Sequence, residues 1–217
     1  MQDKFVYFDL GNVLVHFDHD IAVDNVARLT RREAAAVKQA LFTSGLQDQL
    51  ETGLITSAEF ANRAVQSLEC ELHSEALLEA ISAIFQPNDG IVAILDQLKQ
   101  SGVPMAVLSN TCEPHWQWIL RQNWPVMQGW FDYCILSYEA RSMKPDAGIY
   151  EVSEERSGRQ PEQLFFTDDR ADNVAAARAR GWTTHQFTSV DLLADELGPW
   201  LGLTLDPRAM VAPRPAK

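Results

Sequence analysis

The chain has 217 residues, which is enough for one domain with a large insertion or for two small domains. Its formal net charge of −12 disfavours nucleic acid and membrane surfaces as partners, although a bound cation would still admit an anionic small molecule. The sparse cysteines lack metal-type spacing, and the sequence shows neither a secretion signal nor a membrane-spanning apolar stretch, so we expect a cytoplasmic protein.

The first predicted element is a strand over residues 4–8 that ends at Asp9 and is followed by a Gly-Asn turn. In open α/β sheets, ligands bind at the carboxyl ends of the strands. An aspartate at such an end can coordinate a cation or attack a phosphorus atom. Because aspartate before a turn is also common for structural reasons, Asp9 gains weight only from later segments that end strands in the same way.

Residues 18–86 are predicted to be helical throughout, without a convincing strand. Thr30 with Glu33, and Thr56 with Glu59, have the spacing of capping boxes at helix starts. One helical face is expected to carry Leu77, Ile81, Ile84 and Phe85. These patterns indicate an all-helical insertion.

A run of acids and histidines lies at the start of this block and admits two interpretations. His16, Asp18, His19 and Asp20 have the residue types of a metal site. We favour the simpler interpretation, in which they form the linker into the helical block and Asp20 caps a helix.

From residue 87 onward, predicted helices and strands alternate. Strands are expected at residues 105–108, 133–136, 164–167 and 183–187. Helices are expected around residues 91–98, 114–123, 146–157 and 174–180, and from 189 onward. This alternation implies a parallel sheet between two layers of helices, so the expected fold class is three-layer α/β. Residues 206–217, rich in Pro and Ala, are predicted to form a loose tail.

Polar side chains are predicted to meet along one edge of this sheet, because the carboxyl ends of parallel strands share an edge. They are Asp9, Ser109, Asn110, Lys144, Asp168 and Asp169. Crowded carboxylates repel one another unless a cation neutralises them. Two carboxylates with a carbonyl group and waters suit Mg²⁺, whereas a lysine, a serine and free backbone N–H groups suit a phosphoryl group.

Four segments in this order resemble the four motifs of the haloacid dehalogenase superfamily of hydrolases. They are Phe-Asp-Leu-Gly-Asn-Val at 8–13, Leu-Ser-Asn-Thr at 108–111, Met-Lys-Pro at 143–145, and Phe-Thr-Asp-Asp at 166–169 with Asn173. The resemblance implies a Rossmann-like catalytic core over residues 1–15 and 88–205, with residues 16–87 as a small helical cap. The first motif looks most like bacterial sugar-phosphate phosphatases of the glucose-1-phosphate type, and is also similar to the N-terminal phosphatase domain of soluble epoxide hydrolases.

The resemblance also implies roles for individual residues. Asp9 matches the nucleophile that becomes an aspartyl-phosphate. Ser109 matches the hydroxyl that binds the phosphoryl group, with Asn110 adjoining it. Lys144 matches the lysine that neutralises charge between the nucleophile and the phosphate.

The resemblance further implies a Mg²⁺ site formed by Asp9, the carbonyl group of Gly11, and Asp169. Asp168 is expected to orient Lys144 or a metal-bound water. Asn173, by contrast, occupies a position where the fourth motif often carries another acid.

One departure concerns the proton that the leaving group needs. Most phosphatases of this family carry a second aspartate two residues after the nucleophile, and here that position is Gly11. If another group supplies the proton, the first candidates are Asp18 in the linker and Glu51 in the cap. The Glu51-Thr52-Gly53 segment lies near where the family contacts substrate, and a solvated turn between helices is the equal alternative.

The sequence therefore predicts a hydrolase: a Mg²⁺-dependent phosphatase of a small phosphorylated metabolite such as a sugar phosphate. One alternative is a metal-free 2-haloacid dehalogenase, which would use the same nucleophile on carbon. Asp168 and Asp169 argue against it, because that class typically lacks the adjacent acids. The other alternative, motivated by Gly11, is a non-catalytic binding protein built on this fold.

Overall fold

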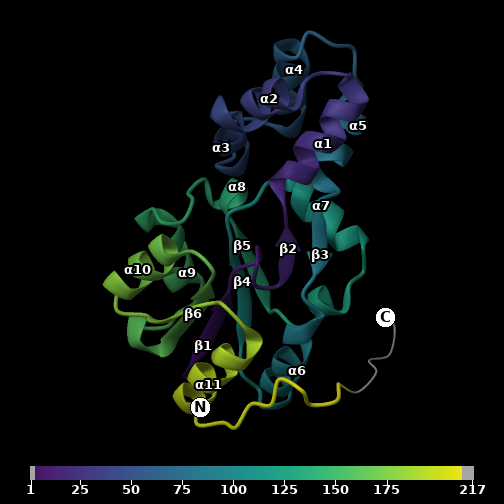
Figure 1. Ribbon diagram of the computed structural model, residues 1–217. Helices are drawn as coiled ribbons and strands as arrows, with labels where there is room; N and C mark the ends of the chain where they lie inside the picture. Colours follow the sequence, from purple (N-terminus) through teal and green to yellow (C-terminus); the bar gives the residue numbers. More distant parts are fainter. Residues whose placement is uncertain (1–2, 212–217) are drawn as a thin grey trace.

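The computed structural model describes residues 3–211 of the chain. It consists of an α/β core and a helical cap that stands over one end of the core sheet (Figure 1). Within the described residues, no helix has both the length and the apolar composition required to cross a membrane.

The core sheet has five parallel strands in the order β5-β4-β1-β6-β7, as predicted for a parallel α/β fold. The strands are β1 Phe5–Phe8, β4 Met105–Ser109, β5 Tyr133–Leu136, β6 Leu164–Asp168 and β7 Thr183–Gln186. All four residues of β1 are buried, which suits the central position of this strand between two helical layers.

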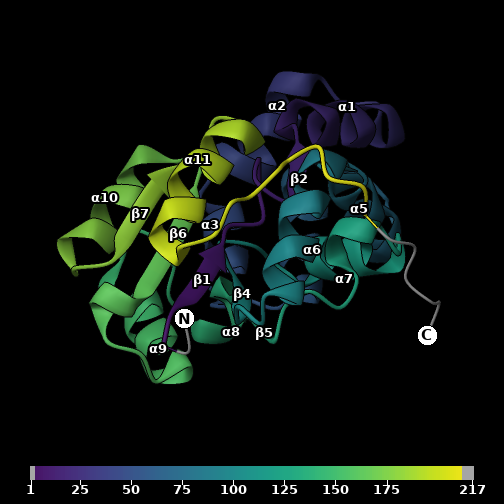
Figure 2. The ribbon, with the colours of Figure 1, turned by 90° about the horizontal axis from the view of Figure 1, so that it is seen from below.

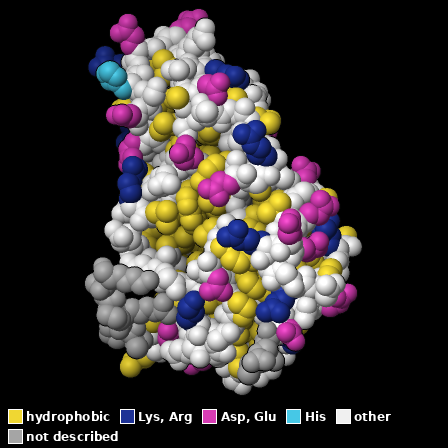
Figure 3. Space-filling model, turned by 180° about the vertical axis from the view of Figure 1, so that it is seen from behind, with side chains coloured by type: hydrophobic (Ala, Val, Ile, Leu, Met, Phe, Trp, Pro, Cys, Tyr) yellow, Lys and Arg dark blue, Asp and Glu magenta, His cyan; other side chains and the backbone are white. Residues whose placement is uncertain are grey.

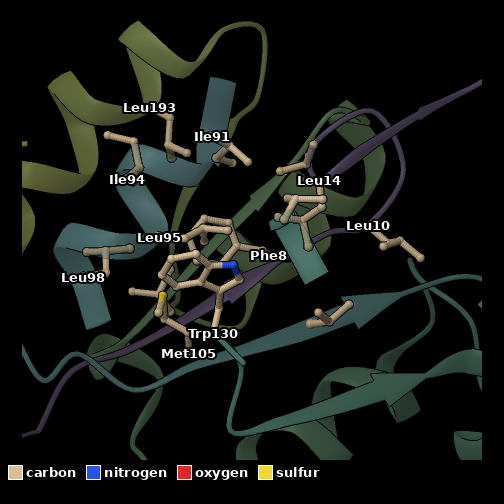
Figure 4. Packing of buried hydrophobic residues seen from close by; sticks show 14 of the residues in the cluster. Phe8, Leu10, Leu14, Ile91, Ile94, Leu95, Leu98, Met105, Trp130 and Leu193 are labelled. Carbon is tan, nitrogen blue, oxygen red and sulfur yellow. The ribbon is translucent and has the colours of Figure 1, made fainter. Parts of the chain in front are cut away.

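Helices cover both faces of the sheet (Figure 2). Val6 and Phe8 face a cluster with α6 Val92–Gln100, α7 Glu113–Arg121 and α11 Val190–Leu201. The alternate residues of β1, Phe5 and Tyr7, pack in a second cluster with α9 Ala147–Ser157 and α10 Ala171–Ala179. In the first cluster, Phe8 lies beside Trp130 and Leu95 (Figure 4).

The cap has its own hydrophobic core, separate from the two core clusters. Its helices are α1 His19–Thr30, α2 Ala34–Lys38, a π-helical turn Gln39–Thr43, α3 Leu46–Glu51, α4 Ser57–Ser67 and α5 Ser74–Ser82. The predicted capping box of Thr56 and Glu59 is confirmed at the start of α4. The one predicted for Thr30 and Glu33 is wrong, because Thr30 ends α1 and the side chain of Glu33 makes no cap bond.

Cap and core are joined by a two-stranded antiparallel ribbon that the sequence did not reveal. It pairs β2 Val15–Phe17 with β3 Phe85–Pro87. The prediction of uninterrupted helix to residue 86 is therefore wrong, since α5 ends at Ser82 and Phe85 belongs to a strand. The ribbon crosses between the cap and the sheet at the edge where the functional side chains were expected (Figure 1).

Further contacts hold the cap against the core. Arg121 and Trp118 of α7 both bind the carboxylate of Glu79 in α5, with N–O distances of 2.8 and 2.9 Å. The Ser57 hydroxyl donates to Glu113 at 2.7 Å. Seen from behind, cap and core form one continuous surface with hydrophobic side chains gathered in its middle (Figure 3).

The remaining elements are short. They are α8 Ser137–Ala140 and the 3₁₀ turns Asp89–Ile91, Pro125–Met127 and Pro161–Gln163. α10 begins three residues before the predicted start at Val174. The predicted tail is described as far as residue 211, and Asp206 in it exchanges two hydrogen bonds with Gln97. Residues 212–217 of that prediction lie outside the described residues.

Candidate active site

Three neighbouring strands bring the predicted polar residues to one edge of the sheet. Asp9 follows β1, Ser109 ends β4 on one side of it, and Asp168 ends β6 on the other. The backbone N–H of Asp9 donates to the carbonyl of Thr167 at 2.9 Å, so pairing of β1 with β6 continues to the site. These three residues therefore lie together at one edge of the sheet, as the parallel topology predicts.

Lys144 lies at the centre of this group and is almost fully buried. Its ammonium donates to Asp9 Oδ1 at 2.7 Å, to Asp168 Oδ2 at 2.6 Å and to the carbonyl oxygen of Leu108 at 2.8 Å. The side chain of Asn110 exchanges two 2.7 Å hydrogen bonds with the backbone of Lys144. Asn110 thus positions the lysine, and its side chain is not free for the predicted contact with phosphate. Its carbonyl oxygen accepts a hydrogen bond from Ser109 Oγ at 3.2 Å.

Asp168 is completely buried and its two oxygens are fully engaged. Besides Lys144, it accepts hydrogen bonds from Asn173 Nδ2 at 3.0 and 3.1 Å and from the backbone of Arg170 at 2.8 Å. The carbonyl of Asn173 in turn accepts from the Tyr150 hydroxyl at 2.9 Å. These contacts fit the expectation that Asp168 orients Lys144.

Asp169 is half-buried, whereas Asp168 is fully buried. Its Oδ2 accepts a hydrogen bond from Asn12 Nδ2 at 2.9 Å. Carboxylate oxygens of Asp9, Asp168 and Asp169 all lie within 4.8 Å of one another. Among the described residues, only this cluster of acids, histidines or cysteines has the spacing of a metal site. The linker residues from His16 to Asp20 do not form such a cluster.

The charges in this cluster do not balance. Three carboxylates meet one ammonium, and burial raises the pKa of Asp9 while Lys144 opposes that rise. Burial would lower the pKa of Lys144, but the charges of Asp9 and Asp168 raise it overall. A divalent cation held by oxygen ligands would neutralise the excess charge, so the cluster fits Mg²⁺.

Gly11 lines the same site, and the ring of Phe17 approaches it closely. A Cβ atom built on Gly11 would lie 2.7 Å from Cε1 of Phe17. Phe17 is held in β2 and packs its ring against His19 and Phe85. The ring therefore occupies the space in which a side chain at position 11 would start.

The site opens into a cavity of about 560 Å³ between cap and core. The core contributes charged and polar side chains, including Asp9, Ser109, Lys144 and Asp169. The ribbon and the cap contribute mainly aromatic and polar side chains: Phe17, His19, Phe42, Gln47, Asp48, Glu51 and Phe85, with His115 from α7. A small molecule with a phosphate at the sheet edge would place its remaining atoms against the cap.

Glu51 is the last residue of α3 and lines this cavity. Gln47, one turn earlier, donates to Glu51 Oε1 at 2.7 Å, and the Ser137 hydroxyl donates to the Glu51 carbonyl oxygen at 2.6 Å. Burial raises the pKa of Glu51 to about 7, with Asp48 adding to the rise and Gln47 opposing it. Asp18, the other predicted proton donor, is exposed, caps α1 and does not line the cavity.

Several residues of this site were not predicted. The sequence predicts Asn12 only as part of a turn. In the structure it adopts the αL conformation, with φ of 55°, and its side chain donates to Asp169. Gln47 precedes Glu51 by four residues, a spacing that indicates a shared helical face. The aromatic wall of Phe17 and Phe85 depends on a ribbon between distant segments, which no local pattern could show.

Comparisons with known proteins agree with this architecture. A family model described as haloacid dehalogenase-like hydrolase matches residues 4–181. D-ribitol-5-phosphate phosphatase of Bacteroides thetaiotaomicron is 26% identical over 196 residues, which cover 84% of this chain and 91% of that protein. (S)-2-haloacid dehalogenase H-109 of Pseudomonas putida is 27% identical over 113 residues, covering 52% of this chain and 49% of that protein.

A solved structure gives the same result. A haloacid dehalogenase family enzyme from Bacteroides thetaiotaomicron, in complex with magnesium and inorganic phosphate, matches with a TM-score of 0.77 and 25% identity. The match covers 86% of this chain and 94% of that one.

Proposed function

The chain belongs to the haloacid dehalogenase-like hydrolase family, and on this basis we propose that it is a Mg²⁺-dependent phosphatase of small phosphorylated metabolites. One observation carries the proposal: Lys144 binds Asp9 and Asp168 at once, within a cluster of three carboxylates at the floor of a covered cavity. The relative named for ribitol 5-phosphate supports sugar and polyol phosphates as the substrate class.

The residues present fit a magnesium ion. Asp9 and Asp169 supply carboxylate oxygens, and Gly11 lines the same site and could add its carbonyl oxygen. The set contains no thiolate or imidazole ligand, which suits a hard cation. The related structure in complex with magnesium and inorganic phosphate supports this choice of metal. When bound, the ion would offset the negative charge of the cluster and of the phosphate.

The protein side chains then divide the chemistry. Asp9 attacks phosphorus in line with the departing oxygen and becomes an aspartyl-phosphate, which water hydrolyses in a second step. Lys144 neutralises charge between Asp9 and the phosphoryl oxygens, while Asp168 and Asn110 hold it in place. Ser109 is almost fully buried beside the cavity and would bind one phosphoryl oxygen.

Dehalogenation is the weaker reading, although the chain also resembles a 2-haloacid dehalogenase. Attack on carbon needs no cation, and Asp169 beside Asp9 would then add an uncompensated negative charge near the nucleophile. A bound cation would compensate the negative charge of the three carboxylates and would allow a phosphate to bind beside them.

The test is release of inorganic phosphate and of chloride by the same purified protein. We expect phosphate from 4-nitrophenyl phosphate and from a panel of sugar and polyol phosphates in the presence of Mg²⁺, with loss of activity after chelation. Chloride release from 2-chloropropionate, together with no phosphate release from any substrate, would contradict the proposal.

A further inference from the structure

A phosphatase with this site needs a group that protonates the leaving-group oxygen. Gly11 has no side chain and cannot supply that proton. Protonation of the departing oxygen by a positioned group is typically worth about 10² to 10⁴ in rate. The ring of Phe17 lies where a Cβ atom at position 11 would be placed. The donor must therefore come from another part of the cavity wall.

The cavity wall outside the strand-end cluster offers four groups that could carry the proton: His19, Asp48 and Glu51 from the cap, and His115 from α7. Burial lowers the pKa of His115 to about 3, so this imidazole is neutral at physiological pH and a poor donor. Burial also lowers the pKa of His19, in spite of its acidic neighbours. Asp48 is exposed to solvent, whereas Glu51 is half-buried.

We propose that Glu51 is the acid and base of this enzyme, giving a proton to the leaving-group oxygen and later taking one from the attacking water. This assignment rests on the proposed phosphatase function. It places the proton donor in the cap, while the nucleophile and the lysine belong to the core.

The position of Glu51 is fixed from both sides. Gln47 holds one carboxyl oxygen, and among residues 3–211 no group donates a hydrogen bond to the other, Oε2. Ser137 of the core binds the backbone of Glu51 directly. Two residues later, Gly53 has a φ of 70°, and a Cβ atom there would lie 2.1 Å from the carbonyl oxygen of Tyr138. The chain around Glu51 is therefore seated tightly on the core.

The electrostatic surroundings suit a group that changes protonation during turnover. Burial raises the pKa of Glu51 to about 7, and Asp48 on the same helix contributes to this rise. Cys112 lies directly before α7. Burial raises the pKa of its thiol most, and the negative charge of nearby Glu51 raises that pKa further. Across the cavity lie the charged groups of the core site: Asp9, Lys144, Asp169 and Arg170.

The two steps conserve protons. In the first, the Asp9–phosphorus bond forms and the phosphorus–oxygen bond to the leaving group breaks, with its electron pair remaining on the departing oxygen. That oxygen takes the Glu51 proton and leaves as an alcohol. In the second, the Glu51 carboxylate takes a proton from water as the water oxygen bonds to phosphorus and the Asp9 bond breaks. Phosphate leaves and Glu51 is protonated again.

Leaving-group dependence separates this role from a structural one. We would measure kcat/KM with Mg²⁺ for 4-nitrophenyl, phenyl and glycerol phosphates in wild type, Glu51→Gln, Glu51→Ala and Glu71→Gln. Both Glu51 variants should lose about 100-fold or more on glycerol phosphate but less than about fivefold on 4-nitrophenyl phosphate, whose leaving group needs no proton. Glu71→Gln changes an exposed acid of the cap that does not line the cavity, and it should keep the wild-type pattern.

Equal losses on all three substrates in the Glu51 variants would overturn the assignment, because a displaced cap slows every substrate alike. The wild-type rates act as the check on the underlying function. If folded wild type hydrolyses none of the substrates, the phosphatase proposal fails and the Glu51 proposal with it; if it hydrolyses them and the losses are equal, only the Glu51 proposal fails.

Discussion

The ammonium of Lys144 lies 2.6 Å from Oδ2 of Asp168, slightly closer than its 2.7 Å contact with Asp9. Asp168 is wholly buried and is itself held by Asn173 and by the backbone of Arg170. Two of the three hydrogen bonds of the Lys144 ammonium, to Asp168 and to the Leu108 carbonyl oxygen, therefore do not involve Asp9.

Replacing Asp168 should consequently impair both catalysis and folding. In Asp168→Asn, the lysine loses its second charged partner, and we expect kcat to fall at least about 100-fold. Loss of this charged hydrogen bond should lower the free energy of unfolding by about 2 kcal/mol. Steady-state kinetics and urea unfolding would measure the two effects. A variant with normal kcat would show that Asp9 alone can position Lys144.

Asp169 should govern the metal requirement. We expect Asp169→Ala to raise the Mg²⁺ concentration for half-maximal rate at least about tenfold, because a carboxylate ligand is lost. Asp172→Ala is the matched control, since Asp172 is a nearby acid that pairs with Arg170. Mg²⁺ titration of the rate distinguishes the two variants, and an unchanged half-maximal concentration in Asp169→Ala would place the metal on other ligands.

Glu51 should reduce stability at neutral and higher pH. Its folded-state pKa of about 7 exceeds the ordinary value of 4.5, so the folded protein retains a proton that the unfolded chain releases. Stability is therefore lost as pH rises from about 4.5 to 7. Glu51→Gln should remove this loss and gain about 2 kcal/mol at pH 8, but little at pH 4.5.

Urea unfolding in the presence of a chelator would measure this gain without a contribution from bound metal. Glu71→Gln, which changes an exposed acid of the cap, is the control and should show no such trend. A constant difference between wild type and Glu51→Gln across this pH range would mean that the carboxyl group titrates normally.

Gly53 should be intolerant of any side chain. Its positive φ and its approach to Tyr138 both oppose a Cβ atom, and we expect Gly53→Ala to cost about 3 kcal/mol in unfolding free energy. Gly45 offers a control in the same cap, with φ of 76° and no atom within 4 Å of a built Cβ. Gly45→Ala should cost about 1 kcal/mol, from backbone strain alone. Equal costs in thermal or urea unfolding would show that the cap does not press on Tyr138.

The parts of the site that could be predicted follow from the topology of a parallel sheet. Asp9 directly follows one buried strand, and Ser109 and Asp168 each end another. The carboxyl ends of neighbouring parallel strands lie at the same edge of the sheet. Lys144 lies in a loop without periodic pattern, so only the resemblance to a family identified it. Its dependence on Asn110 involves two segments far apart in sequence and could not be predicted.

The errors have a common physical origin. The helical spacing of Phe85 from Ile81 predicts a helix, yet Phe85 pairs with Phe17 in a ribbon of two three-residue strands. Pairing between residues so distant in sequence leaves no local signal. The same ribbon places Phe17 against Gly11, a contact that no local pattern in the sequence indicates.

The nucleophile can be identified by trapping the acyl phosphate. Protein turning over 4-nitrophenyl phosphate with Mg²⁺ would be quenched and reduced with borohydride, which converts a phosphorylated aspartate to homoserine, and its peptides would be sequenced by mass spectrometry. We predict homoserine at position 9 only when substrate and Mg²⁺ are both present, and none in folded Asp9→Asn protein, which should also release no phosphate. Phosphate release with an unmodified Asp9, or modification at Asp168 or Asp169 instead, would contradict the mechanism.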